Sequence, residues 1–584
     1  MKAPHIPTDA PFSGEQRSWI GGFIAGLNSQ RLLSGSYADA EPAKSATLMN
    51  VLYGTQTGNA EELANDAAVV ANGRGYSSKL NELDAIDMAA LSQMEHAVIV
   101  VSTYGEGEMP DNANLFWDAV SAQNAPRLEH LNYAVLALGD TSYDEFCQAG
   151  KLIDTRLEQL GAVRMAPRID CDVDYDSAAA EWLDKAIPVA PNINGSTDED
   201  EGPRSAPIDS AVKKPKWNKK NPYGAKLIEN SLLSGEGSAK EIRHISFDLG
   251  DSEIAYQAGD ALGVIPHNAS DLVAAILNFF HVNFDKQIDG YDVPIGILLT
   301  EKYEIMTPSR EFIHEIEKRA SNRELSQALG NKAALEKILW GKDILDLLDM
   351  LPDNKLDVEE FLSWLRPLQH RAYSISSSSK VFSSEIHLTV AAVRWNYQNR
   401  EHKGVASTFL SDRVELGETT GIFLSQNKNF RVPSDDDVPM VMVGPGTGVA
   451  PFRAFLQERQ AREASGMNWL FFGDQHKDYD FLYQDELAAM CDSGLLNRLD
   501  LAFSRDQSEK IYVQTRMLER GKHLFSALEE GGHFYVCGDA SRMAKDVEKA
   551  LQEVVGVHGG LTADGATDYI NKLKREKRYL RDVY

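Results

Sequence analysis

Apolar runs that lead into glycine-containing loops, each followed by a helical pattern, occur near both ends of this chain. Near the start, the run at 47–53 leads into Gly54–Glu61. Near the end, the run at 439–443 leads into Gly444–Phe452. Strand–loop–helix units of this kind build parallel sheets, and ligands bind at the loops beyond the carboxyl ends of the strands. The chain is therefore predicted to contain two α/β domains that are far apart in sequence.

Two more apolar runs in the first third of the chain, at 97–101 and 133–138, end in loops that contain Tyr104 and Tyr143. In one parallel sheet these loops would lie beside Gly54–Glu61. Free N–H groups at the start of a helix bind phosphate, and the two tyrosines could enclose a flat ring. The first loop lacks the Lys of a P-loop, which favours a monophosphate over a triphosphate. Taken alone, that loop is equally consistent with an ordinary turn between a strand and a helix.

The chain changes character between these two regions. Strand-like segments interrupted by glycine predict an antiparallel barrel over about 221–432, and the strongly helical part at 271–368 is predicted to be an insertion in it. A serine-rich segment follows, which composition alone would assign to a low-complexity loop. Within it, Arg371, Tyr373 and Ser374 alternate with apolar residues, a pattern typical of a strand. Such a strand would present a cation, a ring and a hydroxyl together, which suits a phosphate beside a flat ring.

The glycine loop near the end of the chain has the spacing G-x-G-x-G, which differs from the Rossmann pattern G-x-G-x-x-G. Further strand–helix units after residue 468 support a nucleotide-binding α/β domain. Asp474 could hold a ribose hydroxyl, which would indicate NAD. Ser504, Arg505 and Lys510 instead form a cationic group that suits the 2′-phosphate of NADPH. We predict NADPH.

Length, charge and cysteine usage restrict the class of protein. At 584 residues the chain is too long for one hydrophobic core, and roughly three or four domains are expected. A net charge of −28 disfavours nucleic acid as a partner. None of the four cysteines lies in a C-x-x-C pair, so no metal site is expected. The same cysteine usage predicts a reducing, cytoplasmic location.

Two segments lie outside the predicted domains. The apolar run Trp19–Leu27 is too short to span a membrane, and its helical period predicts an amphipathic helix. That helix could pack on its own domain, on another subunit or on a membrane surface. The segment 188–215 is rich in Pro, Asn, Ser and acidic residues, which predicts a mobile tether.

Motifs in each region resemble those of known flavoproteins. T-x-T-G-N-A-E, S-T-Y-G-E-G-E and L-G-D-T-S-Y-x-x-F-C resemble the FMN loops of diflavin reductases. R-x-Y-S followed by G-V-A-S resembles the FAD-binding pair of the ferredoxin-reductase family, and Ser504–Gln514 resembles the NADPH segment of diflavin reductases. The chain is therefore identified as a member of the diflavin reductase family.

This resemblance implies a multidomain fold. Its parts are a flavodoxin-like α/β domain, a flexible linker, an antiparallel β-barrel FAD domain with a helical insertion, and a Rossmann-like α/β NADPH domain of the ferredoxin-reductase type. The implied boundaries are 1–45 for an N-terminal tail and helix, 46–188 for the FMN domain, 189–215 for the linker, 216–432 for the FAD domain and 433–584 for the NADPH domain.

The resemblance also assigns residues to each cofactor. Those for FMN are Thr55, Gln56, Thr57, Gly58, Asn59, Ala60, Ser102, Thr103, Tyr104, Gly105, Leu138, Gly139, Asp140, Tyr143 and Cys147. Those for FAD are Thr307, Arg371, Ala372, Tyr373, Ser374, Thr389, Val390, Ala391, Trp395, Gly404, Val405, Ala406 and Ser407. Those for NADPH are Gly446, Thr447, Ser504, Arg505, Lys510, Ile511, Tyr512, Val513, Gln514 and Asp546. An acidic rim that would meet basic electron-transfer partners consists of Glu106, Glu108, Asp111, Asp144 and Glu145.

Four residues are implied to act in catalysis. Ser374, Cys537 and Asp582 would orient hydride transfer from NADPH to FAD. Tyr584 would stack on the flavin and move aside for the nicotinamide. Considered without the resemblance, Cys537 would be an inert buried residue and the end of the chain would be frayed.

Within the family the chain most resembles the flavoprotein subunits of bacterial assimilatory sulfite reductases, on the C-terminal R-D-V-Y, the segment Asn468–Asp474 and the helix at Trp19–Leu27. The implied activity passes electrons from NADPH through FAD and FMN to a haemoprotein (β) subunit with sirohaem and iron–sulfur centres, which reduces sulfite to sulfide for cysteine biosynthesis. The N-terminal region is implied to form a homo-oligomer, and no membrane is involved. Two alternatives stay open: a reductase for another haem acceptor such as a monooxygenase, and a nucleotide-binding scaffold without redox chemistry.

Overall fold

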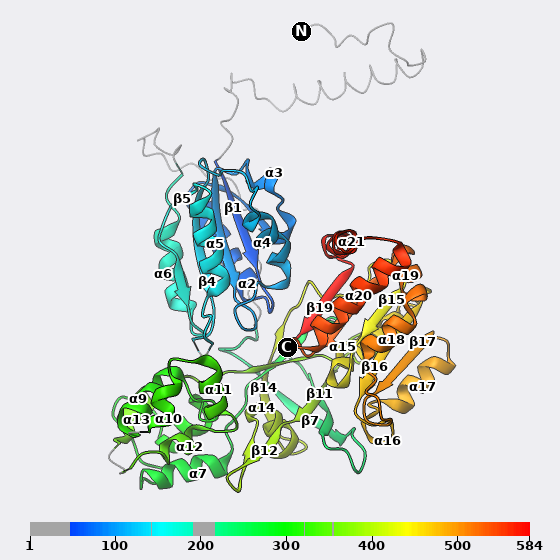
Figure 1. Ribbon diagram of the computed structural model, residues 1–584. Helices are drawn as coiled ribbons and strands as arrows, with labels where there is room; N and C mark the ends of the chain where they lie inside the picture. Colours follow the sequence, from blue (N-terminus) through cyan, green and yellow to red (C-terminus); the bar gives the residue numbers. More distant parts are fainter. Residues whose placement is uncertain (1–46, 142, 191–215, 321, 353–355) are drawn as a thin grey trace, which may run out of the picture.

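The computed structural model describes residues 47–141, 143–190, 216–320, 322–352 and 356–584. These residues form three units, each built around its own sheet (Figure 1). The helix predicted at Trp19–Leu27 and nearly all of the predicted linker lie outside the described residues. Among the helices described, none combines the length and the apolar character needed to cross a membrane.

The N-terminal unit is a parallel sheet with the strand order β2-β1-β3-β4-β5, and β6 also pairs with β4. This is the doubly wound order in which ligands bind at the switch point beside β1 and β3. Its central strands are mostly apolar because helices cover both faces of the sheet. The elements are β1 (Leu48–Gly54), α2 (Asn59–Gly73), β2 (Ser77–Glu82), η1 (Leu83–Ala85), α3 (Met88–Leu91), β3 (His96–Ser102), η2 (Asp111–Ala113), α4 (Asn114–Ser121), β4 (Asn132–Leu138), α5 (Gln148–Gln159), β5 (Val163–Arg164), β6 (Ile169–Cys171) and α6 (Asp176–Ala186).

The middle unit contains an antiparallel six-stranded sheet with the order β10-β9-β14-β7-β8-β11. An isolated bridge from Ile375 to Leu388 links the ends of this order, next to β10 and within β11. A separate hairpin of β12 and β13 follows β11. The elements are β7 (Tyr223–Leu232), β8 (Glu241–Asp248), β9 (Ala261–Val264), β10 (Arg371–Ser374), β11 (Glu385–Ala392), β12 (Arg394–Tyr397), β13 (Arg400–Lys403), α14 (Val405–Thr408), η4 (Phe409–Arg413) and β14 (Thr419–Ser425).

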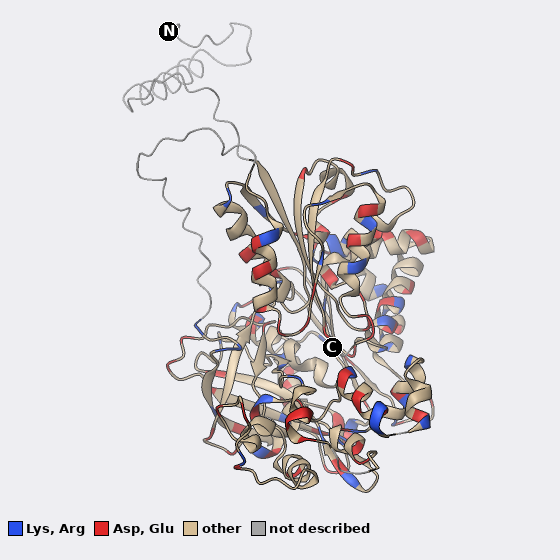
Figure 2. Cartoon of the chain, turned by 90° about the vertical axis from the view of Figure 1, so that its left-hand side faces the viewer, with Lys and Arg blue, Asp and Glu red and all other residues tan. Residues whose placement is uncertain are grey.

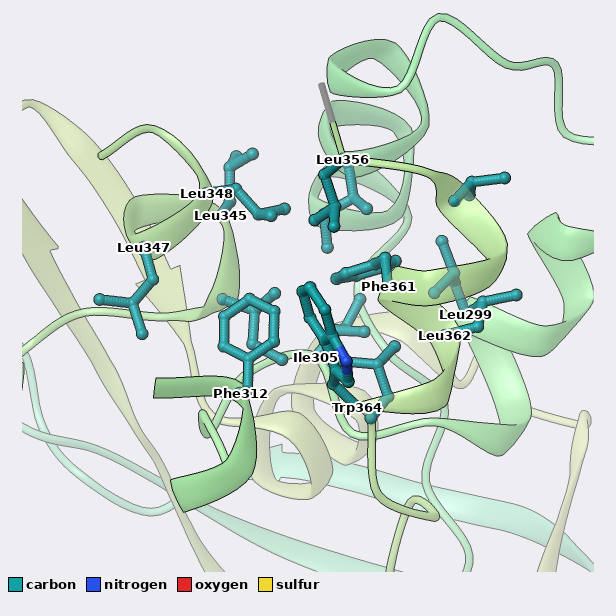
Figure 3. Close-up of a cluster of buried hydrophobic side chains, with 14 of the residues drawn as sticks. Leu299, Ile305, Phe312, Leu345, Leu347, Leu348, Leu356, Phe361, Leu362 and Trp364 are labelled. Atoms are coloured by element: carbon teal, nitrogen blue, oxygen red, sulfur yellow. The ribbon is translucent and has the colours of Figure 1, made fainter. Parts of the chain in front are cut away.

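A helical segment separates β9 from β10 in sequence and has a hydrophobic core of its own (Figure 3). Phe312, Phe361 and Trp364 pack in that core with leucine and isoleucine side chains. The helix predicted at Leu356–Leu365 is shorter than expected, because the Asp357 side chain caps it at its N-terminus. The elements are α7 (Ser270–Phe279), α8 (Ile295–Ile297), η3 (Leu298–Lys302), α9 (Arg310–Ala320), α10 (Arg323–Ala328), α11 (Lys332–Leu339), α12 (Ile344–Leu348) and α13 (Val358–Ser363).

A buried ion-pair network joins this helical segment to the β12–β13 hairpin. Arg400 lies 2.6 Å from Asp343 and 2.7 Å from Asp346, and His402 lies 2.8 Å from Asp346. Asp343 also caps α12, and Trp395 donates a hydrogen bond to the Gly341 carbonyl at 2.9 Å. Asp343, Asp346 and His402 lie close enough together to hold a cation, but the Arg400 guanidinium already pairs with both carboxylates.

The C-terminal unit is a parallel sheet with the order β17-β16-β15-β18-β19. Its last strand corrects the general expectation of a frayed terminus, because Tyr579–Val583 pairs in parallel with β18 along its whole length. Figure 1 shows this strand between the N-terminal unit and the rest of its own sheet. The elements are β15 (Met440–Val443), η5 (Gly446–Val449), α15 (Ala450–Ala461), β16 (Asn468–Asp474), α16 (Lys477–Asp480), α17 (Gln484–Asp492), β17 (Arg498–Phe503), α18 (Val513–Glu519), α19 (Gly521–Glu529), β18 (His533–Gly538), α20 (Met543–Gly559), α21 (Ala563–Arg575) and β19 (Tyr579–Val583).

Candidate functional site

The loop between β1 and α2 is built around the Thr55 hydroxyl. Its oxygen accepts hydrogen bonds from the main-chain N–H groups of Gly58 and Ala60 at 3.0 and 3.3 Å. Gly58 adopts a left-handed conformation with φ of 89°, which favours glycine at this position. Asn112 accepts the Thr55 N–H at 2.7 Å, and this residue escaped the sequence analysis because no local motif marks it. The loop is a compact turn at a helix N-terminus, as a phosphate-binding loop requires.

The two loop tyrosines have different surroundings. Tyr143 is 47% exposed, whereas the Tyr104 hydroxyl donates to the Val583 carbonyl of β19 at 2.7 Å. A cleft open to solvent lies between the β1–α2 loop, the segment 426–429 of the middle unit and the C-terminal unit. Thr55, Gln56 and Gly58 line one side of it, and residues of β19 line the other.

The other residues predicted for FMN lie at the same edge of the sheet. Ser102 and Leu138 end β3 and β4, and Gly139 hydrogen-bonds the Cys171 carbonyl at 2.9 Å. Thr103 accepts the Ala149 N–H at 3.2 Å. Cys147 is fully buried at the start of α5, and burial raises the pKa of its thiol to about 12. Its side chain is therefore an interior packing group that stays protonated at neutral pH.

In the middle unit, Glu304 brings two predicted FAD residues together. One of its carboxylate oxygens accepts the Thr307 N–H at 3.2 Å, and the other lies 3.4 Å from the Arg371 guanidinium. Arg371 and Ala372 are exposed at the start of β10, and Tyr373 is half-buried beside them. The cation and ring of this strand are therefore available at one edge of the antiparallel sheet.

The remaining predicted FAD residues make contacts elsewhere within the protein. Thr389 is buried and hydrogen-bonds the Tyr483 hydroxyl of the C-terminal unit at 2.7 Å, and its neighbours Val390 and Ala391 pack in two hydrophobic clusters. Trp395 packs face to face with His402 at 5.4 Å. Ser407 is buried and accepts the Val393 N–H at 3.1 Å, within the turn that Gly404, Val405 and Ala406 form.

The glycine loop of the C-terminal unit packs tightly against β18. Gly446 is left-handed with φ of 57°, and a Cβ atom at Gly448 would lie 2.2 Å from the Cys537 carbonyl oxygen. Only glycine fits there. Thr447 bonds the Tyr584 hydroxyl at 2.9 Å, while the Tyr584 side chain is 62% exposed. The glycine loop and the last residue, Tyr584, are therefore in direct contact.

Ser374, Cys537 and Asp582 come from three strands and meet at one carboxylate. Ser374 donates to Asp582 at 2.5 Å, and the Cys537 sulfur lies 3.9 Å from the same oxygen. Burial raises the pKa of Asp582, and the hydrogen bond from Ser374 partly opposes that rise. Burial also raises the pKa of Cys537 well above its usual value, so the thiol is neutral. The cluster places a hydroxyl, a thiol and a carboxyl where β10 meets the C-terminal sheet.

The residues predicted to choose between NADPH and NAD differ in their availability. Arg505 and Lys510 are exposed, and neither forms an ion pair with any residue in the described ranges. Asp474 is 1% exposed and pairs with Lys240 at 2.6 Å. Ser504 donates to the Asp474 carbonyl at 3.3 Å, and Gln514 donates to Asp546 at 3.4 Å. The free cations favour a phosphate, and the buried, paired Asp474 is poorly placed to hold a ribose. The other residues of this segment are half-buried Ile511, exposed Tyr512 and buried Val513.

Comparison with known families agrees with this three-part layout. Residues 51–182 match the family described as Flavodoxin, residues 215–409 the FAD binding domain, and residues 442–549 the oxidoreductase NAD-binding domain.

Full-length relatives identify the whole arrangement. The chain is 39% identical over 586 residues to the sulfite reductase (NADPH) flavoprotein alpha-component of Bacillus subtilis, covering 97% of this chain and 95% of that protein. It is 40% identical to the protein of the same name from Vibrio cholerae, covering 99% and 94% of the two chains. It belongs to this flavoprotein family. The alpha-component of Mannheimia succiniciproducens is also 40% identical, over 97% of this chain and 96% of its own.

In this member of the flavoprotein family, the acidic edge of the flavodoxin unit faces basic side chains of the other two units. Figure 2 shows acidic and basic residues on each side of this interface. Lys428 pairs with Glu61 at 2.6 Å, Lys545 with Glu108 at 3.1 Å and Arg366 with Asp140 at 2.8 Å. Further ion pairs join Lys577 to Glu82, Lys332 to Glu106, Arg310 to Asp144 and Arg581 to Asp111. The predicted acidic rim thus meets cations of its own chain, which sequence analysis missed because isolated Lys and Arg residues look like ordinary solvated surface.

Salt is expected to loosen this interface. Most of these pairs are partly exposed, and the screening length falls from about 10 Å at 0.1 M salt to about 3 Å at 1 M. Raising the salt concentration should therefore increase the radius of gyration measured by small-angle X-ray scattering, and dilution should reverse the change. An unchanged radius at both extremes would show that apolar contacts, rather than charges, hold the units together.

Proposed function

We propose that the protein is an NADPH-dependent diflavin electron-transfer subunit that passes electrons from NADPH through FAD and FMN to a haemoprotein subunit that reduces sulfite to sulfide. The observation that carries this proposal is the meeting of Ser374, Asp582 and Cys537 at the boundary between the FAD binding and NAD-binding units. When bound, NADPH supplies a hydride, and the two flavins supply the conversion of that electron pair into single-electron transfers.

The residues predicted to hold FMN suit a flavin phosphate and ring. The Thr55–Ala60 turn lies at a helix start, where the Thr55 hydroxyl fixes its shape by accepting the Gly58 and Ala60 N–H groups, and Tyr143 leaves its ring accessible. The cleft beside Thr55, Gln56 and Gly58 leaves space at that turn. We assign this edge to FMN, with Tyr104 and Tyr143 on either side of the ring.

The residues predicted to hold FAD and NADPH also suit those groups. Exposed Arg371 forms a long ion pair of 3.4 Å with Glu304 and donates to the neighbouring Gln369 and His370 carbonyls, which leaves guanidinium N–H groups that can bind a pyrophosphate. Gly446 allows the left-handed turn and Gly448 allows the loop to pack on β18 at the start of a helix, an arrangement that suits a dinucleotide, and Arg505 and Lys510 suit its 2′-phosphate. We further propose that the antiparallel sheet is the FAD-binding barrel and that 271–368 is its helical insertion.

The protein's own groups then have defined tasks. Ser374 and Asp582 hold each other in place, so that the hydroxyl keeps one orientation toward the boundary between the two units. Cys537 contributes a neutral, polarisable sulfur beside Asp582. The Tyr584 side chain lies against Thr447 of the glycine loop and has to move to admit a nicotinamide.

The acceptor follows from the relatives, whose name specifies sulfite reductase. A sirohaem and iron–sulfur protein would be the partner, located with this chain in the cytoplasm. We also propose the boundaries 46–188, 189–215, 216–432 and 433–584, and oligomerisation through 1–45.

Absorbance and reconstitution test the proposal. The purified protein is expected to be yellow, to release FMN and FAD in similar amounts on denaturation, and to support sulfite reduction by NADPH when mixed with its haemoprotein partner. A colourless protein would indicate a nucleotide-binding scaffold. A yellow protein that reduces a monooxygenase haem but not the sulfite-reducing partner would indicate a different acceptor.

A further inference from the structure

Strand β19 contacts all three units of the protein. Toward the middle unit, Asp582 accepts the Ser374 hydrogen bond, and within its own sheet Tyr584 bonds Thr447. Toward the flavodoxin unit, Arg581 pairs with Asp111, with a second contact of 3.3 Å, and the Val583 carbonyl accepts the Tyr104 hydroxyl at 2.7 Å. The consecutive side chains of Arg581 and Asp582 therefore face different units, Arg581 the flavodoxin unit and Asp582 the middle unit, as the alternation of a strand requires.

The Arg581 contact is well suited to hold the strand. Its side chain is 21% exposed and its guanidinium also lies 3.5 Å from Glu548 of α20. A half-buried guanidinium held by two carboxylates has little freedom to change rotamer. One carboxylate belongs to its own unit and the other to the flavodoxin unit, so the strand is fully held only while the flavodoxin unit is docked.

We propose that Arg581 is a positioning residue through which docking of the flavodoxin unit orders the hydride-accepting site. Its pairing with Asp111 fixes β19, which carries Asp582 and is followed directly by Tyr584. The inference rests on the proposed function, because it concerns the step between NADPH and FAD. Under this proposal Asp111, a residue of the flavodoxin unit, affects the transfer from NADPH to FAD. The flavodoxin unit itself takes part only in the later transfer from FAD to FMN.

Electrostatics provides a second route for the same coupling. The groups that face Asp582 are Cys537 of β18, Asp111 of η2, Tyr104 of the loop after β3, Ser374 of β10, and Arg581 and Tyr584 of its own segment. The negative charge of Asp111 raises the pKa of Asp582, in addition to the effect of burial. Docking therefore raises the pKa of this carboxyl in addition to holding its strand.

Stopped-flow reduction of the flavin-loaded full chain by NADPH tests the proposal. Asp111→Asn is expected to slow FAD reduction by about fivefold or more and to move the midpoint of its pH profile to lower pH. Asp111→Glu keeps the charge and should restore the rate to within about twofold of the natural protein. Arg581→Gln, which removes the pair from the other side, should slow the same step.

The control is Lys332→Gln, which also removes an ion pair to the flavodoxin unit but from the middle unit, since Lys332 lies on α11, away from β19. It should leave FAD reduction unchanged. Natural rates in Asp111→Asn and Arg581→Gln, or an equal slowing in Lys332→Gln, would overturn the proposal. Flavin content is measured in every variant. If the natural protein holds no flavin, or NADPH does not reduce it, the proposed function fails instead.

Discussion

Replacing Ser374 with Ala is expected to slow reduction of FAD by NADPH by about ten- to a hundredfold while FAD stays bound. The Ser374 hydroxyl donates to Asp582 at 2.5 Å, and its loss leaves a largely buried carboxyl without its strongest partner. Stopped-flow absorbance measures the rate, and denaturation followed by chromatography measures the FAD content.

The matched control for that variant is Ser379→Ala in the same serine-rich segment. The Ser379 hydroxyl donates to the Tyr256 carbonyl at 2.8 Å, inside the middle unit and away from β19. It should leave the rate of FAD reduction near that of the natural protein. Loss of FAD from Ser374→Ala would make Ser374 a binding residue rather than a catalytic one.

The second large effect is expected at Arg505. A hydrogen bond to a charged group contributes about 1.5–3 kcal/mol, which corresponds to roughly 10- to 150-fold in kcat/KM. Arg505→Ala should therefore lower kcat/KM with NADPH by that factor and leave kcat/KM with NADH nearly unchanged, because only NADPH carries the 2′-phosphate.

Arg498→Ala provides the comparison for Arg505. Its guanidinium lies 4.9 Å from the Trp469 ring on the same sheet, so it is engaged within the protein. That substitution should affect both cofactors equally. Equal catalytic efficiency with NADPH and NADH in the natural protein, unchanged by Arg505→Ala, would contradict the assignment of a 2′-phosphate site.

The parallel sheets could be predicted because their strands have a clear signal in the local sequence. Val51, Ile99 and Leu136 belong to uninterrupted apolar runs, and β1, β3 and β4 lie within one residue of the predicted runs. The alternation of Arg371, Tyr373 and Ser374 likewise matched β10. A continuous buried strand needs no distant partner to be recognised.

Other elements depend on distant partners and left no such signal. Strand β19 carries Arg581 and Asp582 in its centre, and their charges are accommodated by Asp111, Glu548 and Ser374, which are remote in sequence. From the local sequence alone, those charges predict a solvent-exposed C-terminus. The grouping of Ser374, Cys537 and Asp582 came from the family resemblance, and although the structure brings them together, their catalytic role stays a prediction.

The helical segment between β9 and β10 has a consequence for how the chain folds. The register pairs Val264 with Arg371, so pairing β9 with β10 closes a loop of about a hundred residues, and the entropy cost of that closure is smaller if those residues are already compact. Contacts that are distant in sequence slow folding, whereas helices with local contacts form quickly. Because the segment has its own core around Phe312 and Phe361, it can collapse first and shorten the distance that β10 must search. We therefore expect the residues that separate the two strands in sequence to help bring them together during folding.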